Sequence, residues 1–319
     1  MKQKILGIPT WLFLAFAGVC VIGILVGSFV DLSFSKAVAS TSNGLGAFVE
    51  TFGETLAFAP FGISAMMLFL AFRKKEATWM KVLAWVALIA VIGVGTYYLG
   101  DFVYGKTGTP NKDGTLFFGF RIENKILAFG YGFLLTAIFA AITFFIVDQN
   151  KEEELLRVGL ALLAAMALQW LLLHFLKRVG GRPRFRFLYL LGSDSGVWEG
   201  THYEFLNWWQ FTWYKNPGND YFKSWPSGHS ATAGVALLFG LLPHVLKKNF
   251  KYDTYILFGC GALYGFFVAF SRILAGAHYL SDVSMGLLIG CLVSYVSALL
   301  ADKLFRKKQE ETPEPAIQE

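Results

Sequence analysis

Two histidines with polar neighbours suggest catalysis. His229 closes the run Pro-Ser-Gly-His at 226–229, and His278 stands four residues before Asp282. A histidine can attack an electrophile or transfer a proton. A spacing of four residues can place Asp282 on one helical face with His278, where a carboxylate can hold the imidazole tautomer. This pattern fits combined covalent and acid–base catalysis.

Basic residues near the two histidines indicate that the substrate is an anion. Lys177 and Arg184 follow a long apolar run, and Arg272 lies six residues before the second histidine. Ammonium and guanidinium groups are standard partners of phosphoryl oxygens. Backbone N–H groups near Ser227 and Gly228 would add the positive end of a helix dipole, and a glycine lets an anion approach the backbone closely. The set predicts phosphoryl transfer by positioning and charge stabilisation.

The same residues allow other interpretations. A basic cluster at a membrane edge is often an anchor for lipid headgroups. His229, His278 and Asp282 together could form a metal site. Three neighbouring cations would repel a divalent ion, so neither a metal nor another cofactor is expected.

The composition shows which elements must position these residues. The chain of 319 residues is 55% hydrophobic and 16% charged, with a mean hydropathy of +0.51. That is too apolar for a soluble globule of this size. Runs of about 20 apolar residues are long enough to cross a bilayer core. They predict eight spans, at 10–31, 55–72, 80–99, 125–147, 157–176, 228–246, 254–272 and 281–301. We therefore expect an all-α, polytopic membrane helix bundle.

The order of these runs brings the polar residues to one end of the bundle. The basic stretch 177–186 follows the fifth run, 226–229 opens the sixth, and 271–282 joins the seventh to the eighth. Lysine and arginine at the opposite ends of the runs, as in 72–81, predict cytoplasmic termini and an outward-facing site. The net charge of +6 fits membrane orientation and contact with membrane lipids better than nucleic-acid binding.

Three segments, in this order, resemble the signature of the type 2 phosphatidic acid phosphatase superfamily of integral membrane lipid phosphatases. The second motif is intact as Pro-Ser-Gly-His at 226–229, and the third is intact over 271–282. The first motif keeps Lys177 and Arg184 at the family spacing, but Phe185 replaces the family's proline. This departure affects the turn after the arginine rather than a phosphate contact.

The resemblance implies a metal-independent phosphatase that works through a phosphohistidine intermediate. Carried over by position, His278 would be the nucleophile, Asp282 its orienting partner and His229 the general acid. The residues that would bind the phosphoryl oxygens are Lys177, Arg184, Ser227, Gly228 and Arg272.

The family core has six spans, and its first motif ends the third of them. Here the first motif ends the fifth span, so one helix pair is additional. We expect a single membrane phosphatase domain over 1–308, with 80–147 as the additional pair. The Gly- and Thr-rich segment 100–124 is predicted to be an irregular loop, and 309–319 a disordered cytoplasmic tail.

An outward-facing site at the membrane surface favours a lipid phosphate or diphosphate as the substrate. Undecaprenyl diphosphate is the first expectation and a phosphatidic acid-type lipid the second, in a bacterial plasma membrane. Two alternatives remain: a phosphotransferase that uses the same pocket, and a non-hydrolytic lipid or anion transporter.

Overall fold

The computed structural model describes residues 4–40, 44–106, 124–190, 195–212, 220–248 and 250–310. Within these ranges, seven helices are long and apolar enough to cross a membrane. They are α1 (Thr10–Val38), α3 (Ala59–Arg73, preceded by η1, Leu56–Phe58), α4 (Thr78–Lys106), α5 (Lys125–Ile146), α6 (Glu152–Gly180), α9 (Asp253–Leu274) and α10 (Leu280–Glu310). They confirm the predicted all-α polytopic membrane bundle. In lipid, a helix satisfies its backbone groups internally, which is why such apolar runs become helices.

The sixth predicted span, 228–246, is not among these seven helices and is built differently. A short helix, α8 (Gly228–Gly234), continues into a 3-10 helix, η4 (Val235–His244). Residues 229–238 are all buried. Gly286 and Gly290 of α10 allow α8 to pack this closely. A Cβ at Gly286 would lie 2.4 Å from the carbonyl oxygen of Ser227, and one at Gly290 would lie 2.5 Å from that of Ala231. Small residues four apart let two helices approach closely.

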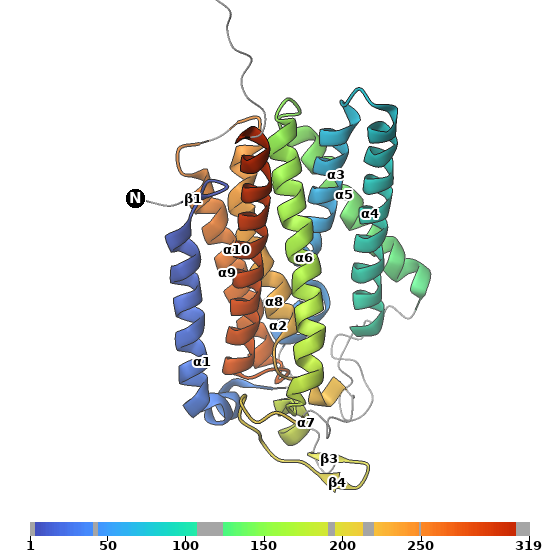
Figure 1. Cartoon of the computed structure of the whole chain (residues 1–319). Helices are drawn as coiled ribbons and strands as arrows, with labels where there is room; N and C mark the ends of the chain where they lie inside the picture. The colour runs from blue at the N-terminus through green and yellow to red at the C-terminus, as the bar shows by residue number, and fades with distance from the viewer. Residues whose placement is uncertain are drawn as a thin grey trace, which may run out of the picture.

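Figure 1 shows how the long helices are grouped. α1, α9 and α10 form one side of the bundle, α3, α4 and α5 form the other, and α6 lies between them. α8 packs against both α9 and α10. The prediction that 80–147 is the pair added to a six-helix core corresponds to α4 and α5, and it stays a prediction.

The charges at the ends of α6 explain how this helix delivers part of the first motif. Its first turn contains Glu152, Glu153 and Glu154, and its last turn contains Lys177 and Arg178. Acidic residues at the start of a helix and basic residues at its end both complement the helix dipole. The long apolar middle of α6 separates the two groups, so Lys177 is held at one end of the bundle.

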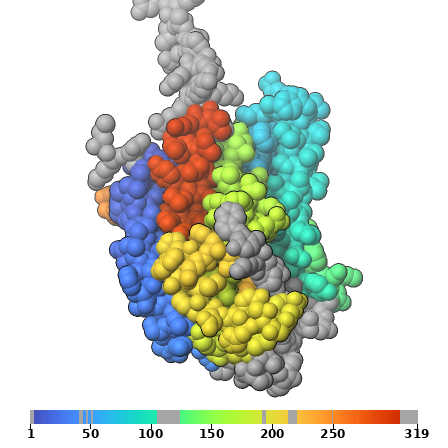
Figure 2. Space-filling model, turned by 60° about the horizontal axis from the view of Figure 1, so that its bottom comes forward, coloured from blue at the N-terminus to red at the C-terminus, as the bar shows by residue number. Residues whose placement is uncertain are grey.

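Short elements cover that same end. α7 (Phe185–Tyr189), β3 (Val197–Trp198) and β4 (Thr201–His202) lie there, opposite the hairpin of β1 (Lys4–Ile5) and β2 (Ile8–Pro9) and the end of α10. Two further elements reach it: α2 (Gly44–Phe52) and η3 (Asp220–Phe222). Figure 2 shows the segment 195–212, in yellow, spread over this end beside α1 and α10.

Two sequence predictions fall largely outside the described residues. Of the loop predicted at 100–124, the part at 107–123 is not among them. Of the tail predicted at 309–319, the part at 311–319 is not among them, and α10 continues through Glu310.

Candidate active site

A cavity of about 680 Å³ lies where the three motifs meet. Five of the eight predicted site residues line it: Lys177, Arg184, Gly228, His229 and His278. Away from this polar end, the wall is formed by apolar and aromatic side chains of α3, α4 and α6, among them Phe61, Val94, Tyr98, Met166 and Trp170. The cavity therefore combines an anion-binding end with a long apolar wall.

His278 lies in the turn between α9 and α10. Gly276, at φ 62°, adopts the left-handed conformation that commonly follows a helix end. The backbone N–H of His278 then donates to the carbonyl of Arg272 at 3.3 Å. The side chain is 1% exposed, and its Nδ1 donates to the carbonyl oxygen of Ser224 at 2.5 Å. A carbonyl can only accept, so the Nδ1 atom carries the proton and Nε2 is left with its lone pair.

The charges around His278 favour its neutral form. Burial, together with the positive charges of Arg184, Lys177 and Arg272, lowers the pKa of His278 well below its usual range. The hydrogen bond to the Ser224 carbonyl acts in the opposite direction, but its effect is smaller. The imidazole is therefore neutral at physiological pH, which is the state that a nucleophilic nitrogen requires.

Asp282 has a different partner from the one its spacing suggests. The carboxylate accepts from the Ser224 hydroxyl at 2.6 Å and from the N–H of Tyr279 at 2.9 Å. It does not contact the imidazole of His278, because α10 begins only at Leu280 and the helical four-residue spacing does not apply across its start. Asp282 therefore holds Ser224, and Ser224 holds His278.

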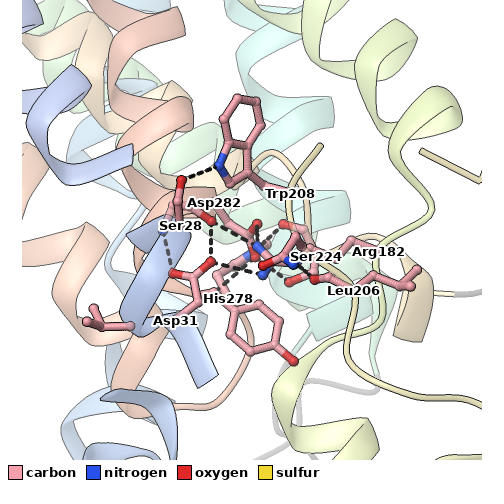
Figure 3. Close-up of polar contacts among 12 residues, drawn as sticks. Ser28, Asp31, Arg182, Leu206, Trp208, Ser224, His278 and Asp282 are labelled. Atoms are coloured by element: carbon pink, nitrogen blue, oxygen red, sulfur yellow. Dashed lines mark hydrogen bonds and ion pairs between the residues drawn. The ribbon is translucent and has the colours of Figure 1, made fainter. Parts of the chain in front are cut away.

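Asp31, which lies outside the three motifs, and Arg182, which lies between the two fixed basic residues of the first motif, extend this network (Figure 3). The guanidinium of Arg182 lies between two carboxylates, 2.6 Å from Asp282 and 2.9 Å from Asp31. Asp31 comes from α1 and also accepts from the N–H of Ser281 at 2.9 Å. All of these side chains are buried. A charged residue within a membrane helix is costly and usually faces a partner inside the bundle, and that is the one sequence signal that Asp31 offered.

The basic residues predicted to bind phosphate differ in their surroundings. Arg184 donates to the carbonyl of Asp220 at 2.8 Å, and its Nη1 lies 3.4 Å from the carbonyl of Ala277. Arg272 is fully buried. Its Nη2 forms an ion pair with Glu50 at 3.1 Å, while its Nε and Nη1 have no hydrogen-bond partner among the described residues. A buried guanidinium with unused donors is costly, and an anion would satisfy it.

Phe185 replaces the family's proline without disturbing Arg184. It is the first residue of α7, with Arg184 as the N-cap in an extended conformation. Proline is favoured at the first helical position because the N–H there needs no helical partner, and an apolar residue fits the same position. Phe185 is buried and packs edge-on against the Tyr279 ring at 6.2 Å between centroids. The guanidinium of Arg184 still lines the cavity.

The motif at 226–229 starts α8 and fixes its position against α10. Ser227 is the N-cap, and its hydroxyl oxygen accepts from the N–H of Ser230. The N–H of Ser227 donates to the carbonyl of Asp282 at 3.0 Å, so this residue connects α8 to α10 behind the cavity wall. Gly228 lines the cavity, where a Cβ would lie 3.6 Å from the Lys177 Nζ atom. His229 is buried and faces the same cavity.

Two carboxylates from the segment after α1 complete the site, and sequence reasoning missed both. Glu50 pairs with Arg186 and Arg272, each at 3.1 Å. Glu54 lies 3.2 Å from the Nδ1 atom of His229. Burial would raise the pKa of Glu50, but Arg186, Arg272 and Arg184 outweigh it and hold that pKa below its usual range. The available signal was two acidic residues, four apart, next to an apolar span.

Comparison with known proteins finds a family similarity in the C-terminal part of the chain. Residues 158–306 match the family model of the PAP2 superfamily, and this segment contains all three motifs. The match confirms the predicted resemblance to the type 2 phosphatidic acid phosphatase superfamily, whose members are phosphatases. No curated protein and no solved structure matches the chain. In the described part of the chain, no group of three or more His, Cys, Asp or Glu side chains is arranged to hold a metal ion.

Proposed function

We propose that the protein is a metal-independent lipid phosphate or diphosphate phosphatase that uses His278 as its nucleophile. The observation that carries the proposal is the environment of this histidine. Its ring is neutral, its Nδ1 proton is held by the Ser224 carbonyl at 2.5 Å, and it lines the cavity together with Lys177 and Arg184. Its Nε2 lone pair is the one available to attack phosphorus.

The proposed reaction has two half-reactions. In the first, Nε2 of His278 forms a bond to phosphorus while the bond from phosphorus to the lipid oxygen breaks. His229 gives its proton to that leaving oxygen, which departs as an alcohol or as a lipid monophosphate. In the second, a water oxygen attacks the phosphohistidine, its proton returns to His229, and inorganic phosphate leaves with His278 restored. Asp282 supports the nucleophile through Ser224.

The cationic groups of the site stabilise the phosphoryl charge. Lys177, Arg184 and the N-terminus of α8 at Gly228 face the cavity and would contact the phosphoryl oxygens. Arg272 adds positive charge from behind, with two donor nitrogens that no described residue uses. Ser227 would act mainly by capping α8 and holding Gly228 in place. Fixed donors aimed at developing charge are commonly the largest single contribution to catalysis.

A lipid substrate is supported by the apolar wall of the cavity. From the polar end, the wall follows α4 and α6 along Tyr98, Trp170, Met166 and Val94. An alkyl or isoprenoid chain would gain about 0.8 kcal/mol per buried methylene against such a surface. We propose undecaprenyl diphosphate as the first substrate to test and a phosphatidic acid-type lipid as the second.

The proposed location is a bacterial plasma membrane, with cytoplasmic termini and the site on the outer face. Support comes from the positions of the basic residues. The β1–β2 hairpin and the end of α10 lie opposite the site (Figure 1). Arg73 ends α3, and Lys74 and Lys75 follow it. Lys151 and Lys247 lie at the same end, because Lys74 donates to the carbonyl of Gln149 and Lys247 donates to the carbonyl of Phe145. Basic residues beside membrane spans favour the cytoplasmic side.

The test is phosphate release by the purified full-length protein in detergent, from a panel of lipid phosphates and diphosphates, with and without excess EDTA. We expect release that EDTA does not reduce and that His278→Ala abolishes. Complete loss with EDTA, restored by zinc, would instead indicate a metal enzyme. Transfer of phosphate to a lipid or alcohol acceptor without release would indicate a phosphotransferase. Lipid movement across vesicles that persists in His278→Ala, without any hydrolysis, would indicate a transporter.

A further inference from the structure

The segment formed by α2 and η1, residues 44–58, is held firmly against the site end of the bundle. Tyr264 of α9 accepts a hydrogen bond from the N–H of Ala57 at 3.1 Å and donates to the carbonyl of Gly53. The hydroxyl groups of Thr55 and Tyr131 lie 2.8 Å apart, which connects the segment to α5. Its side chains therefore occupy defined positions in the site, although none of the three motifs includes them.

Glu54 of this segment contacts the ring of His229. The carboxylate oxygen lies 3.2 Å from Nδ1, and both side chains are almost fully buried. The Phe102 ring packs edge-on against the imidazole, with 5.2 Å between centroids. Attraction between a carboxylate and an imidazolium is stronger in such a water-poor environment than in bulk water. The contact therefore orients the ring and favours its protonated form.

The two histidines of the cavity stand in opposite environments. Nδ1 of His278 donates to a backbone carbonyl, and cations surround the ring. Nδ1 of His229 instead contacts the carboxylate of Glu54. Lys177 and Arg184 line the same cavity and would disfavour a further positive charge, which Glu54 offsets at His229. Environments that drive two titratable groups towards opposite charge states assign one as the base or nucleophile and the other as the acid.

We infer that Glu54 is a positioning residue for the general acid: it holds the Nδ1 proton of His229 and keeps the ring as an imidazolium, so that Nε2 donates to the leaving oxygen. This inference rests on the proposed function. The Nε2 atom lies 3.5 Å from the carbonyl of Glu50, too far for a strong hydrogen bond, and can be redirected to a substrate. When the lipid oxygen takes the Nε2 proton, a neutral imidazole remains. Its proton stays on Nδ1, where it is hydrogen-bonded to Glu54.

Glu50, one helical turn earlier, provides a matched comparison. Its carboxylate pairs with Arg186 and Arg272 rather than with the His229 ring. Removing its charge disturbs cations near the phosphate, which matter equally for every leaving group. Removing the charge of Glu54 disturbs proton donation, which matters most for a poor leaving group. The two substitutions are thus equal in chemistry and adjacent in structure, but they differ in expected effect.

The experiment compares Glu54→Gln and Glu50→Gln on two substrates: phosphatidic acid in mixed micelles, which loses an alkoxide, and p-nitrophenyl phosphate, which loses a stable phenolate. Glu54→Gln should lower kcat on the lipid by about 10²-fold, the scale of acid–base assistance, and should lower it far less on p-nitrophenyl phosphate. Glu50→Gln should change kcat by the same factor on both substrates. Glu54→Asp, which keeps the charge, should retain part of the lipid activity.

Non-additivity provides a second measurement. In a His229→Ala background, Glu54→Gln should cause no further loss on the lipid, because it acts through a ring that is no longer present. An equal loss on both substrates, or a full additional loss in the His229→Ala background, would overturn the inference while leaving the phosphatase proposal intact. If Glu54→Gln does not fold, Glu54→Asp decides. A ratio of its kcat on the lipid to its kcat on p-nitrophenyl phosphate that equals the ratio of the unaltered protein overturns the inference. Absence of phosphate release by the unaltered protein contradicts the proposed function and the inference with it.

Discussion

His278 and Asp282 are joined through Ser224 rather than through a direct contact. The carbonyl of Ser224 accepts from Nδ1 of His278 at 2.5 Å, and its hydroxyl donates to Asp282 at 2.6 Å. One residue thus transmits the position of the carboxylate to the imidazole through its own backbone. The carboxylate itself is fixed by Arg182, which is paired in turn with Asp31 of α1.

Ser224→Ala should therefore impair catalysis without abolishing it. The substitution removes the hydroxyl that binds Asp282 but keeps the carbonyl that binds His278. Loss of an outer support of this kind typically costs about 10- to 100-fold, and we expect a loss in kcat with little change in KM. Steady-state kinetics on p-nitrophenyl phosphate measure it. A loss as complete as that of His278→Ala, in folded protein, would show that the hydroxyl itself takes part in the reaction.

Asp31→Asn should destabilise the protein, because it leaves the Arg182 guanidinium with a single carboxylate partner in a buried site. Weakening one member of a buried charge network costs about 1–3 kcal/mol. Thermal unfolding in detergent should show a lower midpoint. Ser28→Ala is the control: it lies nearly one turn earlier on α1 and removes no charge, only a hydroxyl that accepts from Trp208 at 2.9 Å and donates to the Ile24 carbonyl at 2.9 Å. Equal midpoints for the two variants would contradict a structural role for the Asp31–Arg182 pair.

The pH dependence of activity should show an acid limb below the ordinary range of histidine. His278 must be neutral to attack, and burial with the neighbouring cations lowers its pKa. Activity is thus retained as the pH falls through about 6.5, the unperturbed value, and is lost only when the pH passes the lowered pKa. Profiles of kcat/KM on p-nitrophenyl phosphate report this limb.

Removing one of the cations near His278 tests whether they lower its pKa. Lys177→Gln should raise the pKa of His278 and shift the acid limb to higher pH, in addition to weakening phosphate binding. Lys223→Gln removes a different charge from the cavity wall and should leave the limb in place. An identical limb in the unaltered protein and in Lys177→Gln would show that the limb belongs to another group.

Alanine variants of the two histidines should lose different steps of the reaction. His278→Ala removes the nucleophile and should form no phosphoenzyme with any substrate. His229→Ala keeps the nucleophile but loses the proton donor, so that p-nitrophenyl phosphate, whose phenolate leaves unaided, should still phosphorylate His278. Rapid acid-free trapping with radiolabelled substrate detects this phosphoenzyme. A phosphoenzyme in His278→Ala, or no detectable phosphoenzyme in either folded variant, would mean that the roles are assigned wrongly.

The proposed orientation predicts which residues an impermeant thiol reagent reaches. Val197 and Lys248 are both exposed. Val197 lies in β3 at the site end of the bundle (Figure 1), whereas Lys248 follows Lys247, whose N–H donates to the carbonyl of Ile146 at the far end of α5. In a Cys260→Ser background, which removes the exposed native thiol, Val197→Cys should be labelled in intact cells. Lys248→Cys should be labelled only after permeabilisation. The reverse pattern would place the site on the cytoplasmic side.

The sequence by itself determined the bundle and the end at which its site lies. Apolar runs of span length must be helical in lipid, and their order alone places 177–186, 226–229 and 271–282 at one end. His278, His229, Lys177, Arg184 and Gly228 do line one cavity. These predictions succeed because they depend on the length and order of local segments, which can be read directly from the chain.

Only the tertiary structure decided how the site residues are paired. The four-residue spacing of His278 and Asp282 has its helical meaning only within a helix, and α10 starts between them. The contact of Glu54 with His229 joins residues 175 positions apart, and that of Asp31 with Arg182 joins residues 151 apart. Such contacts depend on how helix ends and loops pack in three dimensions, and neither composition nor periodicity records that packing.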